Sequence, residues 1–190
     1  MQKTLIVLLL IFTSSVFGAC PPQGQTRQSL QALKATKFVM TDPVARTALA
    51  QDLLDCLSDP DPVMRDGIAY SALAEWMRAD DFDAATLRTM RDALYTQLDR
   101  RDEIGFGRPF AALVLSEVAR TDRIRAWMTP GERAAMVEKA ANYVAAVRDY
   151  RGFDDKQGWR HGVAHGADWL MQLAMNPALS RSDTDRILTA

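Results

Sequence analysis

The histidines are the residues of this sequence best suited to chemistry, because the chain has only two and they stand four residues apart, at His161 and His165. In a helix, at about 100° per residue, their imidazoles and the carboxylate of Asp168 lie within an arc of about 60°. Two imidazoles one turn apart, with a carboxylate beside them, can bind a divalent metal such as zinc. The pattern therefore allows a metal-dependent hydrolase as an alternative function.

The rest of a catalytic set is missing from this segment. A zinc protease of the His-Glu-x-x-His type needs Glu directly after the first histidine, where this chain has Gly162. The sequence also has no Cys-x-x-Cys, Gly-x-Ser-x-Gly or phosphate-binding loop. A purely structural explanation is that the histidines form hydrogen bonds between helices, while Gly162 and Gly166 allow close helix contact. We therefore expect a binding role without a cofactor, rather than catalysis.

Helix-start signals recur along the chain. A capping residue precedes a proline at Asp42-Pro43, Asp61-Pro62 and Thr129-Pro130, and proline is favoured at the first helical position. Apolar residues then recur at intervals of three and four, and no stretch alternates with a period of two. The predicted helices cover residues 26–40, 43–57, 62–79, 84–99, 109–120, 130–149 and 159–175, with another beginning near Ser182. Two loops are of interest, 100–108 and 150–158.

A repeated pattern indicates how these helices pair. Residues 58–65 and the apolar positions after them resemble the HEAT motif, and Arg65, Arg108 and Arg160 stand at equivalent helix starts, 43 and 52 residues apart. HEAT-type periods are about 40–47 residues. We therefore expect an all-α fold, a short HEAT-like α-solenoid of paired antiparallel helices. The alternative is an irregular helical bundle.

The same alignment extends the candidate site beyond the histidines. It places Asp66 and Tyr70 at the helical positions of His161 and His165, so these side chains would line one groove on successive inner helices. Asp154 and Asp155, in the loop before the histidines, would lie at its rim. Alternatively, these two aspartates pair with neighbouring basic side chains. We predict a ligand-binding site formed by His161, His165, Asp168, Asp154, Asp155, Asp66 and Tyr70.

The N-terminus has the organisation of a secretory signal peptide. Lys3 precedes an unbroken apolar run over residues 5–12, and small residues follow. We expect residues 1–19 to be removed, leaving residues 20–190 as a single helical domain in the periplasm or secreted from a bacterium. Residues 17–20 also resemble a lipobox, so a lipoprotein anchored through Cys20 is the alternative.

The two cysteines, Cys20 and Cys56, predict one disulfide in an oxidising compartment. Such a bridge would stabilise the fold by ~3–4 kcal/mol. The alternative is a buried, free Cys56 beside a lipidated Cys20.

Charge and composition restrict the partners. Lys and Arg number 23 against 24 Asp and Glu, without clustering, which argues against nucleic acid, since nucleic acid needs a basic face. No stretch after the signal peptide predicts a transmembrane segment. The remaining partners are an unknown protein, a peptide or a small molecule.

Four segments resemble the bacterial domain of unknown function 2785 family: residues 61–70, 106–115, 149–153 and 158–168. The resemblance spans residues 28–190 and implies no known activity. Family members are expected to be longer at the C-terminus. This agrees with an apolar stripe that begins at Ile187 and Leu188 and stops at residue 190, so the domain is expected to be truncated there. Our hypothesis is an exported helical-repeat binding or interaction module.

Overall fold

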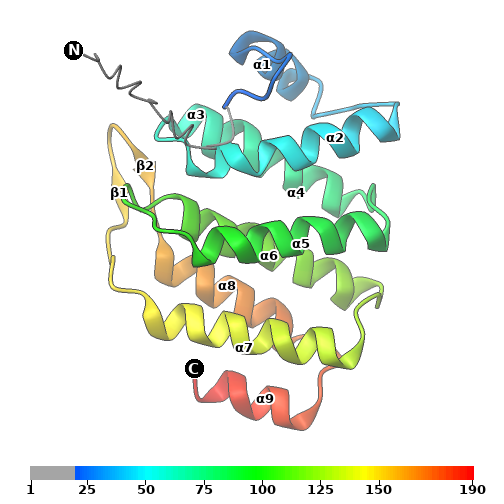
Figure 1. Cartoon of the computed structure of the whole chain (residues 1–190), viewed down its shortest axis with the longest axis vertical. Coiled ribbons are helices and arrows are strands. Elements are labelled where there is room, and N and C mark those ends of the chain that lie inside the picture. The colour runs from blue at the N-terminus through cyan, green and yellow to red at the C-terminus, as the bar shows by residue number, and fades with distance from the viewer. Residues whose placement is uncertain (1–19) are drawn as a thin grey trace, which may run out of the picture.

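The computed structural model describes residues 20–190, and the predicted signal peptide lies outside this range. Figure 1 shows the helices in two layers, stacked along the long axis. The front layer contains α2 (Pro43–Leu53), α5 (Ala84–Asp99) and α7 (Pro130–Ala146); behind them lie α4 (Ser71–Arg78), α6 (Gly107–Ile124) and α8 (Gly162–Ala174). At the two ends of the stack lie α1 (Arg27–Ala35) and α9 (Arg181–Leu188). The all-α class is confirmed.

Several shorter elements interrupt this pattern. The predicted helix 62–79 consists of α3 (Pro62–Met64), the π-helical turn η2 (Arg65–Tyr70) and α4, and a 3₁₀ turn, η1 (Asp55–Ser58), precedes it. The predicted loop 150–158 contains most of a hairpin that the sequence pattern did not indicate, in which β1 (Phe153–Asp154) pairs antiparallel with β2 (Gly158–Trp159).

The predicted helix starts are confirmed. Asp42, Asp61 and Thr129 are N-caps whose side chains accept hydrogen bonds from the first turn, and Thr129 forms a capping box with Glu132. The first predicted helix, 26–40, is too long, because α1 ends at Ala35. The reason is local, because the residues after it enter the left-handed region, with Phe38 at φ 58°.

The centre of the core is α6, which packs against α4, α5 and α8. The α7–α8 contact requires glycine, because a Cβ on Gly166 would lie 2.6 Å from Cγ2 of Val144 and 2.9 Å from Cε1 of Tyr143. This confirms the expected close helix contact at Gly166.

The predicted disulfide is present. Cys20 and Cys56 are bridged across 36 positions, with their Cα atoms 5.1 Å apart. The bridge ties the start of the described chain to the buried turn η1. Among the helices of residues 20–190, none has the length and apolar character needed to cross a membrane.

Candidate functional site

One side of the helix stack brings together the starts of α6 and α8, the end of α7 and the hairpin (Figure 1). Arg65, which is 0% exposed, organises this side. Its guanidinium donates to the carbonyls of Gln157, at 2.7 Å, and Asp59, at 3.0 Å, and lies 3.8 Å from the ring centre of Phe106. The guanidinium of Arg160 lies 4.3 Å from the same ring centre. The hairpin is thereby held against the helix starts.

The sequence predicted a helix that begins at residue 159, but α8 begins at Gly162, so His161 lies before the helix. It is the N-cap of α8, in the left-handed region at φ 53° and ψ 34°. The hairpin causes this late start, because the N–H groups of Arg160 and His161 donate to the carbonyls of Gly152 and Arg151, at 3.1 and 3.3 Å. The imidazole of His161 stacks on Trp159, with the ring centres 3.9 Å apart and the planes at 13°.

His165 lies inside the fold, at 7% exposure. Its Nδ1 is 3.1 Å from the carbonyl oxygen of Pro109, which can only accept, so Nδ1 carries the proton. Burial, joined by the positive electrostatic influence of His161 and Arg65, lowers the pKa of His165 to about 4. At neutral pH this imidazole is therefore a neutral link between α6 and α8, as the structural explanation requires.

The histidine pair gains no support as a metal site. The ring centres of His161 and His165 are 5.8 Å apart, and one ring is stacked on Trp159 while Nδ1 of the other is bonded to a carbonyl. Across residues 20–190, no group of three or more His, Cys, Asp or Glu side chains is arranged to hold a metal ion.

The three predicted aspartates Asp154, Asp155 and Asp66 lie in the hairpin turn and in η2. Asp154 accepts from the backbone N–H groups of Gln157 and Lys156, both at 2.9 Å, and these bonds lower its pKa and close the hairpin turn. Asp155 is exposed at the same turn. Asp66 accepts from Nε of Arg65 at 2.9 Å. Asp154 thus bonds to backbone N–H groups of its own turn, and Asp66 pairs with Arg65.

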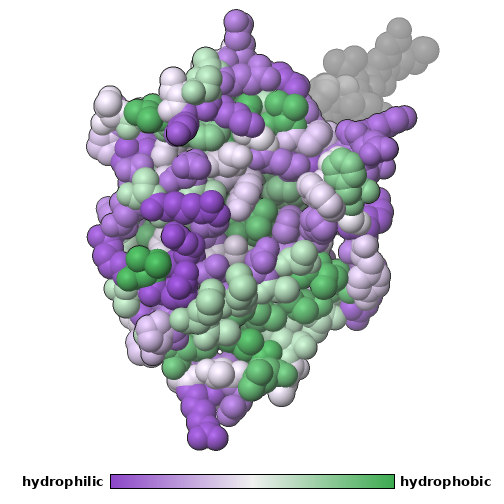
Figure 2. All heavy atoms as spheres, turned by 180° about the vertical axis from the view of Figure 1, so that it is seen from behind, coloured by the Kyte–Doolittle hydropathy of each residue, from purple (hydrophilic) through white to green (hydrophobic). Residues whose placement is uncertain are grey.

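Tyr70 and Asp168 lie in the layer formed by η2, α4, α6 and α8. Burial raises the pKa of both, and the negative charge of Glu117 on α6 raises both further. Glu117 is itself buried and paired with Arg78. Figure 2 shows this layer from behind, with hydrophobic side chains gathered over its lower part. Val163 and Met171 on α8, and Met175 directly after it, are exposed.

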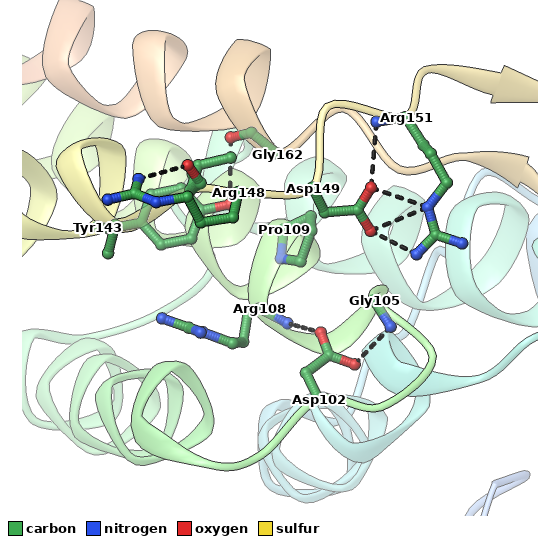
Figure 3. A pocket seen from close by; sticks show the side chains of 11 residues that line it. Asp102, Gly105, Arg108, Pro109, Tyr143, Arg148, Asp149, Arg151 and Gly162 are labelled. Atoms are coloured by element: carbon green, nitrogen blue, oxygen red, sulfur yellow. Dashed lines mark hydrogen bonds and ion pairs between the residues drawn. The ribbon is translucent and has the colours of Figure 1, made fainter.

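The same side of the stack contains a cavity that the histidine pattern did not indicate (Figure 3). It has a volume of about 290 Å³ and lies between the start of α6, the end of α7 and the segment before β1. Its lining residues are Asp102, Gly105, Arg108, Pro109, Tyr143, Ala146, Val147, Arg148, Asp149, Arg151 and Gly162.

Two smaller depressions adjoin this cavity. One, of about 270 Å³, shares Arg108, Tyr143 and Ala146 with it. The other, of about 260 Å³, shares Arg151 and Gly162 and also contains His161. The predicted residue His161 thus lies beside the cavity, whereas His165 and Asp168 do not line it.

The carboxylates of the cavity already have partners. Asp102 accepts from the backbone N–H groups of Gly105, at 2.9 Å, and Arg108, at 2.8 Å. Asp149 is paired with Arg151, whose hydrogen bond is the first cause that holds the pKa of this carboxyl below its usual range. These groups shape the wall and leave no unpaired carboxylate to act as a base.

The two remaining arginines of the cavity wall, Arg148 and Arg108, differ in their hydrogen bonding. Arg148 donates to the carbonyls of Ala145 and Val147, both at 2.8 Å. The guanidinium of Arg108 has no hydrogen bond or ion pair with any residue of the described chain, and its Nε is buried. Figure 3 shows this side chain extending away from Asp102. The cavity wall therefore contains one guanidinium without a partner among the described residues.

The sequence contained a partial signal for this site. The two loops of interest, 100–108 and 150–158, supply Asp102, Gly105 and Arg151 to the cavity wall. The sequence marks Arg108, in the first of these loops, only as a repeat position, and Tyr143 lies within the predicted helix 130–149. Their role depends on the start of α6 and the end of α7 meeting at one cavity, which the local pattern does not encode.

Comparison with known protein families identifies a relationship. A family model described as "Protein of unknown function (DUF2785)" matches residues 94–190, which include the cavity and the hairpin. The matched range excludes the resembling segment at residues 61–70. No curated protein and no solved structure matches the chain.

Proposed function

We propose that this chain, which belongs to the family of proteins of unknown function DUF2785, is a binding module that holds a small molecule in the cavity between α6 and α7. The observation that carries this proposal is the 290 Å³ cavity with the unpartnered guanidinium of Arg108 in its wall. Ligand sites are typically apolar hollows with a few polar groups, and this volume is at the small end of their range, about 300–1,000 Å³.

The scaffold that we propose is HEAT-like. Consecutive helices α5 and α6, and then α7 and α8, pack against each other, and the second helix of each pair lies in the same layer. Arg65 and Arg160, two of the three aligned arginines, meet on the ring of Phe106. These relationships support a repeat of helical pairs over an irregular bundle.

Binding fits the site better than catalysis does. The cavity carboxylates are already paired, and the neutral imidazole of His165 is hydrogen-bonded inside the fold. In this proposal His161 borders the ligand through the adjoining depression, and Asp154 and Asp155 remain at the outer rim. No cofactor is required.

We further propose that the protein is exported to the periplasm or secreted. The Cys20–Cys56 disulfide is compatible with an oxidising compartment. A sulfur engaged in this bridge cannot also carry the thioether of a lipid anchor, so we favour the soluble form. Mass spectrometry of the mature protein tests this, since a lipid-modified Cys20 or a retained Met1 would contradict it.

Blocking the cavity tests the binding function. Ala146 lines both the main cavity and the first depression, whereas Ala145 is exposed and lines neither. We expect compounds from a diverse small-molecule set that raise the melting temperature of the wild type to lose this effect in Ala146→Phe and keep it in Ala145→Phe. If no compound distinguishes the two variants, the proposed function is wrong.

A further inference from the structure

We infer that the cavity selects a small organic monocarboxylate with an apolar body, held through Arg108. This inference rests on the proposed function and adds the chemical class of the ligand. It follows from the hydrogen-bonding state of Arg108, from the balance of charges around it and from the apolar part of the wall.

Arg108 is the group in the cavity best placed to bind an anion. It stands in the first turn of α6, and its buried Nε has no partner among residues 20–190. A guanidinium presents its N–H donors in a planar fork that matches both oxygens of a carboxylate. The two Nη atoms of Arg108 also form no hydrogen bond with residues 20–190, so a carboxylate bound in the cavity that Arg108 lines would supply an acceptor.

The surrounding charges limit the ligand to a single negative charge. Asp149 is paired with Arg151, and in the adjoining depression Asp99 is paired with Lys139 at 3.2 Å. Asp102 already caps the start of α6, so the helix N-terminus is not open to a second anion. The lining contains three arginines, Arg108, Arg148 and Arg151, against Asp102 and Asp149, a net charge of +1. A monoanion neutralises this wall, whereas a dianion such as a phosphate monoester would leave an excess of negative charge beside the two aspartates.

The rest of the wall accepts an apolar group. Pro109, Val147 and Ala146 line the cavity together with Tyr143, whose hydroxyl is used internally in a 3.1 Å hydrogen bond to the carbonyl of Gly162. With that hydroxyl engaged, the tyrosine offers mainly its ring. A ring or a branched aliphatic chain attached to the carboxylate would cover these side chains.

The test compares benzoate and cyclohexanecarboxylate with benzamide, the neutral counterpart of benzoate, and with inorganic phosphate. Affinities are measured by calorimetry and saturation-transfer NMR on the wild type, Arg108→Gln and Arg125→Gln. Arg125 is an exposed arginine at the opposite end of α6 and serves as the matched control. Far-UV circular dichroism and melting temperature verify that each variant is folded.

We expect the two carboxylates to bind the wild type and Arg125→Gln equally, and Arg108→Gln to lose about 10–100-fold in affinity, as for a charged hydrogen bond. Arg108→Lys, which keeps the charge but not the fork, should lose less. Equal binding of benzamide and benzoate, tighter binding of phosphate, or unchanged affinity in Arg108→Gln would each overturn the inference.

The same experiment separates this inference from the proposed function. If neutral compounds bind in a manner that Ala146→Phe abolishes while carboxylates do not bind, the cavity is a ligand site of another class and only the inference fails. If Ala146→Phe and Ala145→Phe behave alike with every probe, both fail.

Discussion

The guanidinium of Arg65 donates a 2.7 Å hydrogen bond to the carbonyl of Gln157, which lies 92 residues later in the chain. This contact joins the π-helical turn η2 to the hairpin that precedes α8. The hairpin in turn determines where α8 begins and where His161 stands beside the cavity. One buried cation therefore connects two segments that lie far apart in the sequence beside the candidate site.

Replacing Arg65 by Met should lower the free energy of unfolding by about 3 kcal/mol, because the carbonyl of Gln157 and the carboxylate of Asp66 lose a charged donor. Urea denaturation measures this effect. Arg101→Met is the control, since the Arg101 side chain is 87% exposed and should change stability by less than about 0.5 kcal/mol. Equal stability of the two variants would contradict the structural role of Arg65.

His165 should make the protein less stable as the pH falls from about 6.5 to about 4. Its pKa is lowered from 6.5 to about 4 by burial, with contributions from His161 and Arg65. Between these pH values His165 is protonated in the unfolded chain but stays neutral in the folded protein, so the free energy of unfolding decreases by roughly 3 kcal/mol. Below the folded pKa, both states are protonated and this contribution ends.

The variant His165→Asn isolates this effect, because an amide nitrogen can still donate to the Pro109 carbonyl but does not titrate. Urea denaturation at several pH values between 7 and 4 should show a shallower loss of stability than in the wild type. His161→Asn is the control for removal of a histidine from the same segment. A pH dependence in His165→Asn equal to that of the wild type would show that His165 is not the buried neutral group described here.

Removal of the Cys20–Cys56 bridge should cost about 4 kcal/mol, since it closes a long loop in the unfolded chain. The melting temperature of the wild type should fall when a reductant is added, and thiol titration should detect both cysteines only after reduction. The double variant Cys20→Ser, Cys56→Ser should be insensitive to reductant. Two free thiols in protein isolated without reductant would contradict the bridge.

The close contact of α7 and α8 predicts opposite results for two glycines. Gly166→Ala should lower the free energy of unfolding by about 1–3 kcal/mol, because the added methyl overlaps Val144 and Tyr143. Gly131→Ala, in the first turn of α7 with nothing within 4 Å of the added Cβ, should be neutral or stabilising by up to about 1 kcal/mol. Urea denaturation of both variants checks this difference, and a tolerated Gly166→Ala would mean that the helices can separate without cost.

The helix starts at Asp42, Asp61 and Thr129 were predictable because capping is a local interaction. Each of these side chains bonds to an N–H only two or three residues later, so the residue types and their order contain the whole signal. The disulfide was predictable for a different reason, since the chain has only two cysteines to pair. The apolar periodicity likewise determined that the fold is helical.

The position of His161 was decided by tertiary structure. Helical periodicity placed it on a regular helix with His165, but the hairpin holds it in a left-handed conformation before the helix begins. The strands of that hairpin are two residues long, too short to produce an alternating pattern. Their stability depends on Arg65, which is remote in sequence.

The amino-acid sequence by itself determined the helices, their caps, the disulfide and the family resemblance, because these depend on neighbouring residues or on residue counts. Only the tertiary structure decided that His165 is neutral and that Arg108 faces a cavity. Both properties arise from burial between helices: His165 meets Pro109 across 56 positions, and the cavity wall combines α6, α7 and α8. Desolvation and missing hydrogen-bond partners are properties of packed surfaces, so no local pattern could encode them.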